Sequence, residues 1–263
     1  PQALEKLNGW VKARDASRQP AAMYAMGSLL LEKDDLSGAV KMAEEGLSKY
    51  PQSLPVQILS LNTITVLLDK NRLQDAERLI SKYPGSSPDL VFQQGALAFL
   101  KKDYSLAQKL FREAARRASE TTAENALFNE NLAALNANDA SGAAALIKEA
   151  AGSSRLRESI LFEQAHYAAK RMAPQAAELL ANFITLAETP ALKTQARLDQ
   201  VEVALNLNPP DLETVQAILP LLEKEQLSPE QTMQLARLNI LEAESRQEWP
   251  NAIQSCRRAI ALD

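Results

Sequence analysis

Small and apolar residues recur along this chain at helical spacings, and the pattern repeats about every 35 residues. Gly27, Ala39 and Pro51 follow one another at intervals of twelve residues, and Gly95 is followed twelve positions on by Ala107. Polar breaks divide the repeats into two apolar stretches each, at 33–35, 69–71, 101–103, 136–139 and 246–248. Because no strand-like alternation extends beyond a few residues, the pattern predicts antiparallel helix pairs stacked repeat upon repeat.

The segments between successive pairs carry residues that end one helix and begin the next. Such segments lie at 50–51, 83–88, 152–154, 189–190 and 228–230. Serine followed by proline, as at Ser87 and Ser228, is typical of a helix N-cap with proline at the first helical position. Residues 1–19 are predicted to form an additional helix, which is either a packing cap or half of a partial repeat.

These patterns resemble the tetratricopeptide repeat (TPR) family, whose motif is a helix pair of about 34 residues with small residues where the helices cross. The resemblance places repeat starts near residues 20, 57, 88, 124, 158, 196 and 233. The first and third repeats match best, through Met23, Met26, Gly27, Leu30, Ala39, Ala43, Gly46 and Pro51 in the first and Val91, Gly95, Ala98, Ala107, Phe111 and Ala114 in the third.

The resemblance implies an all-α fold, a right-handed α-α superhelix (TPR-like solenoid) of about seven helix hairpins plus an N-terminal helix. Residues 20–263 would form the solenoid, and residues 1–19 the capping helix or partial repeat. Each repeat of a solenoid packs mainly on its neighbours, so a chain of 263 residues needs no single central core.

The composition and net charge of the chain restrict the kinds of partner that it is expected to bind. The formal net charge of −4 provides no general attraction to nucleic acid, and no apolar run approaches the roughly 20 residues that span a bilayer. A basic stretch with Lys109, Arg112 and Arg116 on one helix face is interrupted by Glu113. We therefore expect no nucleic-acid partner and no membrane insertion by this segment.

The sequence gives only broad expectations for the parent protein and for the cellular compartment of this chain. It begins at Pro1 rather than Met, and we expect it to be one domain of a larger protein of bacterial type. The single cysteine, Cys256, fits either a reducing cytoplasm or a periplasm. A soluble protein of either bacterial compartment is therefore compatible with the sequence.

Residues capable of catalysis or metal binding are sparse. His166 is the only histidine, and it follows Glu163 at a spacing that places both side chains on one helix face. One such pair supplies too few ligands for a closed metal site, and Cys256 lies about three repeats from His166. No phosphate-binding glycine motif occurs. We expect no cofactor, no metal and no enzymatic activity.

The most suggestive set lies on the first helices. In TPR proteins, positions 2, 5, 9 and 12 of the first helix line a concave groove, and position 5 here is aromatic in four of five repeats. The resemblance implies a peptide-binding groove lined by Tyr24, Ser28, Leu61, Asn62, Thr65, Phe92, Gln93, Asn125, Phe128, Asn129, Phe162 and His166. The alternative, equally open on the sequence, is that these rings pack between repeats as core.

Two functional hypotheses follow. The first is a non-catalytic protein-protein interaction scaffold that binds a peptide or protein segment in the concave groove. The alternative is a structural spacer or self-associating module in an envelope or secretion complex, because an uncapped end repeat exposes an apolar face. The lysines of the family's carboxylate clamp are missing, so a receptor for free C-termini is disfavoured.

Overall fold

The computed structural model describes residue 7, residues 9–11 and residues 17–260 of the chain. In these ranges the regular elements are helices, and no strand is present. Of the additional helix expected for residues 1–19, residues 7 and 9–11 are helical, but residues 17 and 18 form a turn and residue 19 begins the next helix. The other residues of that expected helix lie outside the described residues. The chain forms two compact units, residues 1–140 and residues 141–263.

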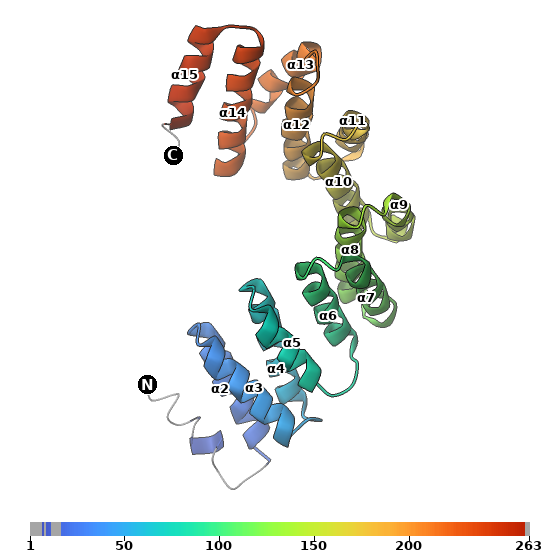
Figure 1. The fold of residues 1–263 in the computed structure, drawn as a ribbon, viewed down its shortest axis with the longest axis vertical. Coiled ribbons are helices and arrows are strands. Elements are labelled where there is room, and N and C mark those ends of the chain that lie inside the picture. The colour runs from blue at the N-terminus through green and yellow to red at the C-terminus, as the bar shows by residue number, and fades with distance from the viewer. Residues whose placement is uncertain (1–6, 8, 12–16, 261–263) are drawn as a thin grey trace. The chain divides into compact units, whose positions relative to one another are not determined.

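The helices follow one another as hairpins (Figure 1). The first unit contains α2 (Gln19–Glu32), α3 (Leu36–Lys49), α4 (Leu54–Asp69), α5 (Leu73–Lys82), α6 (Pro88–Leu100), α7 (Tyr104–Arg117) and α8 (Glu120–Asn136). The second unit contains almost all of α9 (Ala140–Glu149), then η1 (Ala150–Gly152), α10 (Ser154–Lys170), α11 (Ala176–Leu186), α12 (Pro190–Leu205), α13 (Leu212–Leu222), α14 (Pro229–Ser245) and α15 (Trp249–Ile260).

Within each unit, a hairpin packs mainly on its sequence neighbours. Helix α2 contacts α3 and α4, and α3 contacts α4 and α5. In the second unit α10 contacts α11 and α12, and α12 contacts α13 and α14. This sequential packing confirms the predicted all-α solenoid architecture. Each predicted repeat start falls within the even-numbered helix of a hairpin, which we call its first helix.

All but one of the turns inside the described hairpins share one backbone geometry. In the described residues a left-handed residue follows the C-cap at Asp34 (φ 59°), Asn71 (57°), Lys102 (64°), Asn138 (58°), Met172 (50°) and Gln247 (60°). At the second of these turns the amide of Arg72 donates to the carbonyl of Leu67 at 2.8 Å, and that of Asn71 to Leu68 at 2.9 Å. This is a Schellman motif, which satisfies the last carbonyls of the helix and reverses the chain sharply.

The turn between α12 and α13 departs from this geometry. It extends over residues 206–211, contains a cis bond between Asn208 and Pro209, and has no residue with positive φ. The Asp211 amide donates to the Ala204 carbonyl at 3.0 Å, and the Asp211 carboxylate accepts from the Thr214 amide at 3.1 Å. The sixth hairpin is therefore closed by a longer turn and a side-chain cap.

Small residues lie where helices approach most closely, as the repeat pattern predicted. A Cβ atom placed on Gly27 of α2 would lie 2.3 Å from Leu59 of α4, and one on Gly95 of α6 would lie 2.9 Å from the Phe111 ring of α7. Leu59 and Phe111 are almost completely buried. Glycine at these two positions thus lets a large apolar side chain fill the space between the helices.

The predicted helix starts are also confirmed. The Ser87 hydroxyl accepts a hydrogen bond from the Leu90 amide at 3.2 Å, directly before α6. Ser228 and Gln231 form a reciprocal capping box at the start of α14, with distances of 3.2 Å and 3.1 Å. Both helices begin with a proline, so the sequence signal and the observed cap coincide.

Candidate functional site

The predicted groove residues of the first unit occupy equivalent positions on successive first helices. Tyr24 on α2, Asn62 and Thr65 on α4 and Asn125 on α8 are exposed. The remaining residues of the set are half-buried, namely Ser28, Leu61, Phe92, Gln93, Phe128 and Asn129. We call this set the first-unit face.

Hydrogen bonds connect neighbouring residues of the first-unit face. The Gln93 amide donates to the Thr65 hydroxyl at 2.9 Å, so the face is continuous between α6 and α4. On α8 the Asn129 amide donates to the Asn125 carbonyl at 2.8 Å. The face carries hydroxyl and amide groups and one exposed ring, that of Tyr24, and none of its members is an Asp, Glu, Lys, Arg or His residue.

The aromatic rings of the predicted set have different environments. Phe92 packs against Phe111 of α7, with ring centroids 5.3 Å apart. Phe162 is buried and packs against Phe183 of α11 at 5.5 Å. Tyr24, by contrast, is 37% exposed. The rings of Phe92 and Phe162 thus contribute to packing inside their own hairpins, whereas the ring of Tyr24 is accessible to a partner.

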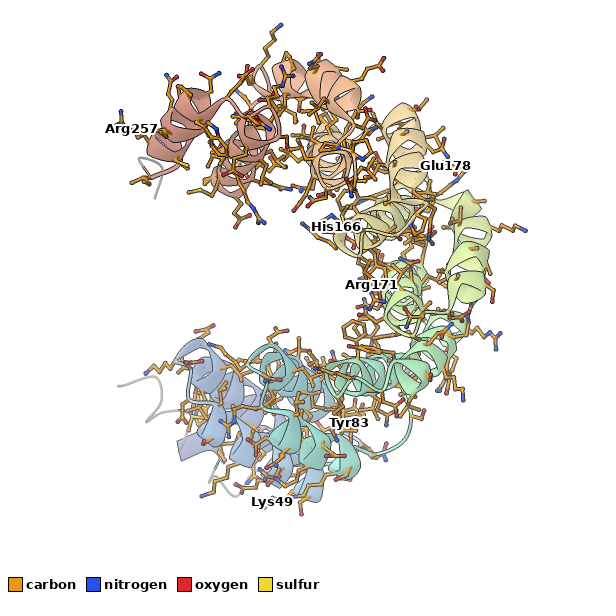
Figure 2. The ribbon with its side chains drawn as sticks, turned by 45° about the horizontal axis from the view of Figure 1, so that its top comes forward. Lys49, Tyr83, His166, Arg171, Glu178 and Arg257 are labelled. Carbon is orange, nitrogen blue, oxygen red and sulfur yellow. The ribbon has the colours of Figure 1, made fainter. Side chains whose placement is uncertain are left out.

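In the second unit, His166 forms the centre of a polar cluster that joins α10 to α12. Its Nδ1 atom lies 2.5 Å from the carboxylate of Asp199, a residue that is only 1% exposed. The imidazole is also stacked on the Phe162 ring, with a centroid separation of 5.4 Å. Figure 2 labels His166 on α10 and Glu178 on α11, the other helix of the same hairpin.

The protonation of this cluster is shifted by its surroundings. The hydrogen bond to Asp199 raises the pKa of His166 above its usual 6.5, even though partial burial acts in the opposite direction. Burial raises the pKa of the nearby Glu163, and the charge of Asp199 raises it further, whereas the charge of His166 lowers it. The imidazolium form is therefore favoured beside the buried carboxylate.

Amide side chains extend this cluster to α14. The Gln195 amide of α12 donates to Asp199 at 3.2 Å and to the Gln234 carbonyl oxygen of α14 at 2.9 Å. Gln234 in turn donates to Glu202 at 3.3 Å. Gln231 donates to Gln195 at 3.3 Å, and Lys170 lies 3.5 Å from Glu202. We call Glu163, His166, Lys170, Gln195, Asp199, Glu202, Gln231 and Gln234 the second-unit face.

Of the second-unit face, the sequence analysis had assigned only His166 to the groove. Several contacts between first helices share a signal, because their two residues lie about one repeat apart. Asp199 is 33 residues from His166, Gln234 is 32 from Glu202, and Gln93 is 28 from Thr65. A search for complementary polar residues one repeat apart would have found these contacts.

Two arginines of the basic stretch on α7 form ion pairs within the protein, whereas Lys109 and Arg116 are exposed. Two guanidinium nitrogens of Arg112 lie 2.8 Å from the Glu130 carboxylate of α8, which is almost completely buried. Arg117 forms an ion pair with Glu113 at 2.7 Å and donates to the Ser86 hydroxyl at 3.0 Å. The half-buried Cys256 lies on α15.

The described residues contain no group of three histidine, cysteine, aspartate or glutamate side chains arranged to hold a metal ion. Among the same residues, no helix combines the length and the apolar character required to cross a bilayer. No model of a known protein family matches the chain. No curated protein matches it at a significant level of sequence similarity either.

Proposed function

We propose that this chain is a non-catalytic, TPR-like protein-interaction module and one domain of a larger bacterial protein. Its ligand is a peptide, which binds on the first-unit face and the second-unit face. The observation that supports this best is the continuity of polar side chains from one first helix to the next. In the second unit, hydrogen bonds link α10 to α12 and α12 to α14 through Asp199, Gln195 and Gln234.

The chemistry of these side chains fits a peptide ligand. Amide groups both donate and accept, so they can exchange hydrogen bonds with a peptide backbone. The first-unit face adds the exposed Tyr24 ring, a residue type that contributes strongly to protein interfaces. The proposed partner is a protein segment in extended or helical conformation.

The proposal is tested by selecting linear peptides from a random library on the full chain and measuring their affinity for variants. Asn62→Arg combined with Asn125→Arg adds two bulky charges to exposed positions of the first-unit face. We expect affinity to fall by about tenfold or more for peptides bound there, because each arginine obstructs the face. Gln74→Arg on α5 is the matched control, since Gln74 is also exposed but lies on a second helix.

A corresponding variant addresses the second unit. Gln195→Ala together with Gln234→Ala removes the amides that link α12 to α14. This variant is expected to lower the affinity for those selected peptides that do not depend on Asn62 and Asn125. Circular dichroism checks that helicity is retained in every variant. Selected peptides that bind all of these variants as tightly as the unaltered chain would contradict the proposal, as would a library that yields no binder.

A further inference from the structure

A cavity of about 200 Å³ opens in the second unit, where the start of α10 lies near the end of α11. Its apolar lining consists of Leu161, Phe183 and Leu186, with Ala151 of η1. Phe183 is 3% exposed, whereas Leu186 is 62% exposed. A cavity of roughly 150 Å³ with a lining of this kind can hold one benzene ring, so this one has room for a single large apolar side chain.

In the first unit, the residue aligned with Leu186 binds the turn that precedes its hairpin. The buried residues of the two helices have the same spacing, namely Ala107, Phe111 and Ala114 on α7 and Ala176, Leu180 and Phe183 on α11. This alignment pairs Arg117 with Leu186. Arg117 donates to the Ser86 hydroxyl at 3.0 Å and to the Ser86 carbonyl oxygen, in the turn before α6. Leu186 cannot form such hydrogen bonds, and the cavity lies between it and the start of α10.

Glu158 holds the end of α11 beside this cavity. Its carboxylate accepts hydrogen bonds from the Glu188 amide at 2.8 Å, and from the Thr189 amide and hydroxyl at 2.7 Å each. The protein itself therefore uses both oxygens of Glu158. The other charged side chains of the lining are Arg157 and Glu188, and both are exposed.

The lining thus combines an apolar wall with accessible charges of both signs. A guanidinium group binds a carboxylate through two parallel hydrogen bonds, and a carboxylate such as that of Glu188 binds an ammonium group. A free α-amino acid carries a carboxylate, an ammonium group and a side chain on one carbon atom. The cavity is smaller than the roughly 300–1,000 Å³ of sites for larger ligands. These properties together match a small zwitterion with one apolar group.

We propose that this cavity binds a free α-amino acid with a large apolar side chain. The side chain packs against Leu161, Phe183 and Leu186. The carboxylate pairs with Arg157, and the ammonium group pairs with Glu188. No residue of the first-unit face or the second-unit face lines the cavity, so this site is independent of the proposed peptide binding.

The test measures dissociation constants on the full chain, from the NMR shifts of the Leu161 and Leu186 methyl groups. L-Phenylalanine has all three recognition groups. L-Alanine lacks the large side chain, phenylpropionate lacks the ammonium group, and phenethylamine lacks the carboxylate. We expect L-alanine to bind more than about tenfold more weakly than L-phenylalanine, because it buries little apolar surface. Each single-charge probe should bind about three- to fivefold more weakly, because one ion pair is lost.

Two charge variants assign the ion pairs. R157Q should weaken the binding of L-phenylalanine and phenylpropionate about three- to fivefold, and leave that of phenethylamine unchanged. E188Q should weaken the binding of L-phenylalanine and phenethylamine by a similar factor, and leave that of phenylpropionate unchanged. Each variant therefore has a control among the probes themselves.

The apolar part of the site is tested with L186R, which gives α11 the residue type that α7 has at the aligned position. Binding of every aromatic probe should weaken by more than about tenfold, because the apolar wall is lost. L221R is the matched control, since Leu221 is 45% exposed on α13, another second helix of the same unit. Circular dichroism checks that both variants keep their helicity.

Four results would overturn the proposal. The first is the absence of any shift of the Leu161 and Leu186 methyl groups with L-phenylalanine and L-leucine alike. The second is equal affinity for L-alanine and L-phenylalanine, and the third is unchanged binding of L-phenylalanine in L186R. The fourth is that N-acetyl-phenylalanine amide, which lacks both charges, binds as tightly as L-phenylalanine, because the cavity would then accept a side chain of a peptide.

Discussion

Each unit buries a carboxylate on a first helix, but the two carboxylates have different partners. Glu130 in the first unit is 2% exposed and pairs with Arg112 of α7, within 2.8 Å. Asp199 in the second unit is 1% exposed and pairs with His166 of α10. A guanidinium stays charged at any physiological pH, whereas an imidazole loses its charge near neutrality.

The Arg112–Glu130 ion pair is independent of pH near neutrality, whereas the His166–Asp199 pair depends on the protonation of the imidazole. The Arg112 pair connects two consecutive helices, whereas the His166 pair connects the first helices of neighbouring hairpins. Because stacking between hairpins supplies much of the stability of a solenoid, the protonation of one side chain should affect the second unit and leave the first unchanged.

The largest expected effect is from Arg112→Met. It leaves the Glu130 carboxylate buried without this cation, and we expect the first unit to lose about 3 kcal/mol of stability. Hydrogen exchange of amides in α6, α7 and α8 measures the loss. Arg116→Met, an exposed site on the same helix, should change stability by less than about 0.5 kcal/mol.

The double variant Arg112→Met with Glu130→Gln sharpens this test. Removing the buried charge as well should recover a large part of the loss. If Arg112→Met lowers the stability of the first unit no more than Arg116→Met does, the ion pair does not stabilise this unit. The comparison between the two units would then fail.

A smaller loss of stability is expected from His166→Ala. At pH 6 we expect the second unit to lose about 2 kcal/mol, because a hydrogen bond to a charged group is removed. Hydrogen exchange in α10 and α12 is the measurement, and exchange in α2 through α7 should not change. Lys170→Ala is the control, since Lys170 is mostly exposed and lies 3.5 Å from Glu202.

The pH dependence follows from the direction of the His166 shift. A raised pKa means that the folded state binds the proton more tightly, so the stabilisation is complete below about pH 6.5 and is lost as pH rises through the raised pKa. The second unit should therefore become less stable from pH 6 to pH 8. The single histidine allows its pKa to be read directly from the imidazole proton resonance in NMR.

Two variants separate the titrating groups. His166→Gln should remove the dependence above pH 6, while the first unit behaves alike in both proteins. Glu163→Gln should remove only the component that begins near pH 4.5, because the raised pKa of Glu163 also makes stability fall with pH. An NMR pKa for His166 at or below 6.5 would contradict the proposed charge pair.

The smallest effects are expected at the turns with a left-handed residue, a geometry that occurs in both units. Lys102 in the first unit and Met172 in the second both have positive φ. Replacing either by glycine should stabilise its unit by about 0.5–1 kcal/mol, because a side chain at positive φ is strained. Thermal unfolding measures the gain. Unequal gains would indicate that the turns differ in a way their backbone geometry does not reveal.

The hairpins and their boundaries could be read from the sequence because their determinants are local. Gly27 and Gly95 occupy close contacts between helices, and Ser87 and Ser228 cap helices where the motif placed them. Each signal extends over a few residues, so the sequence alone identifies it. The TPR resemblance and the groove it implies stay predictions.

The polar clusters could not be predicted in the same way. Asp199 looks like an ordinary surface aspartate in the sequence, and only the fold brings it to His166 from 33 residues away. Arg112 suggested a basic surface, whereas the structure pairs it with the buried Glu130 on the next helix. Burial depends on neighbouring hairpins, so the environment of these groups is a tertiary property.

The long turn between α12 and α13 has a practical consequence. Residues 206–209 are exposed, and the hydrogen bonds that close this hairpin begin at the flanking Ala204 and Asp211. A fluorophore-bearing insertion after Leu207 should therefore be accommodated without disturbing either helix. Such a labelled chain would give an optical reporter on the second unit, in which ligand capture and protonation could be followed in a single titration.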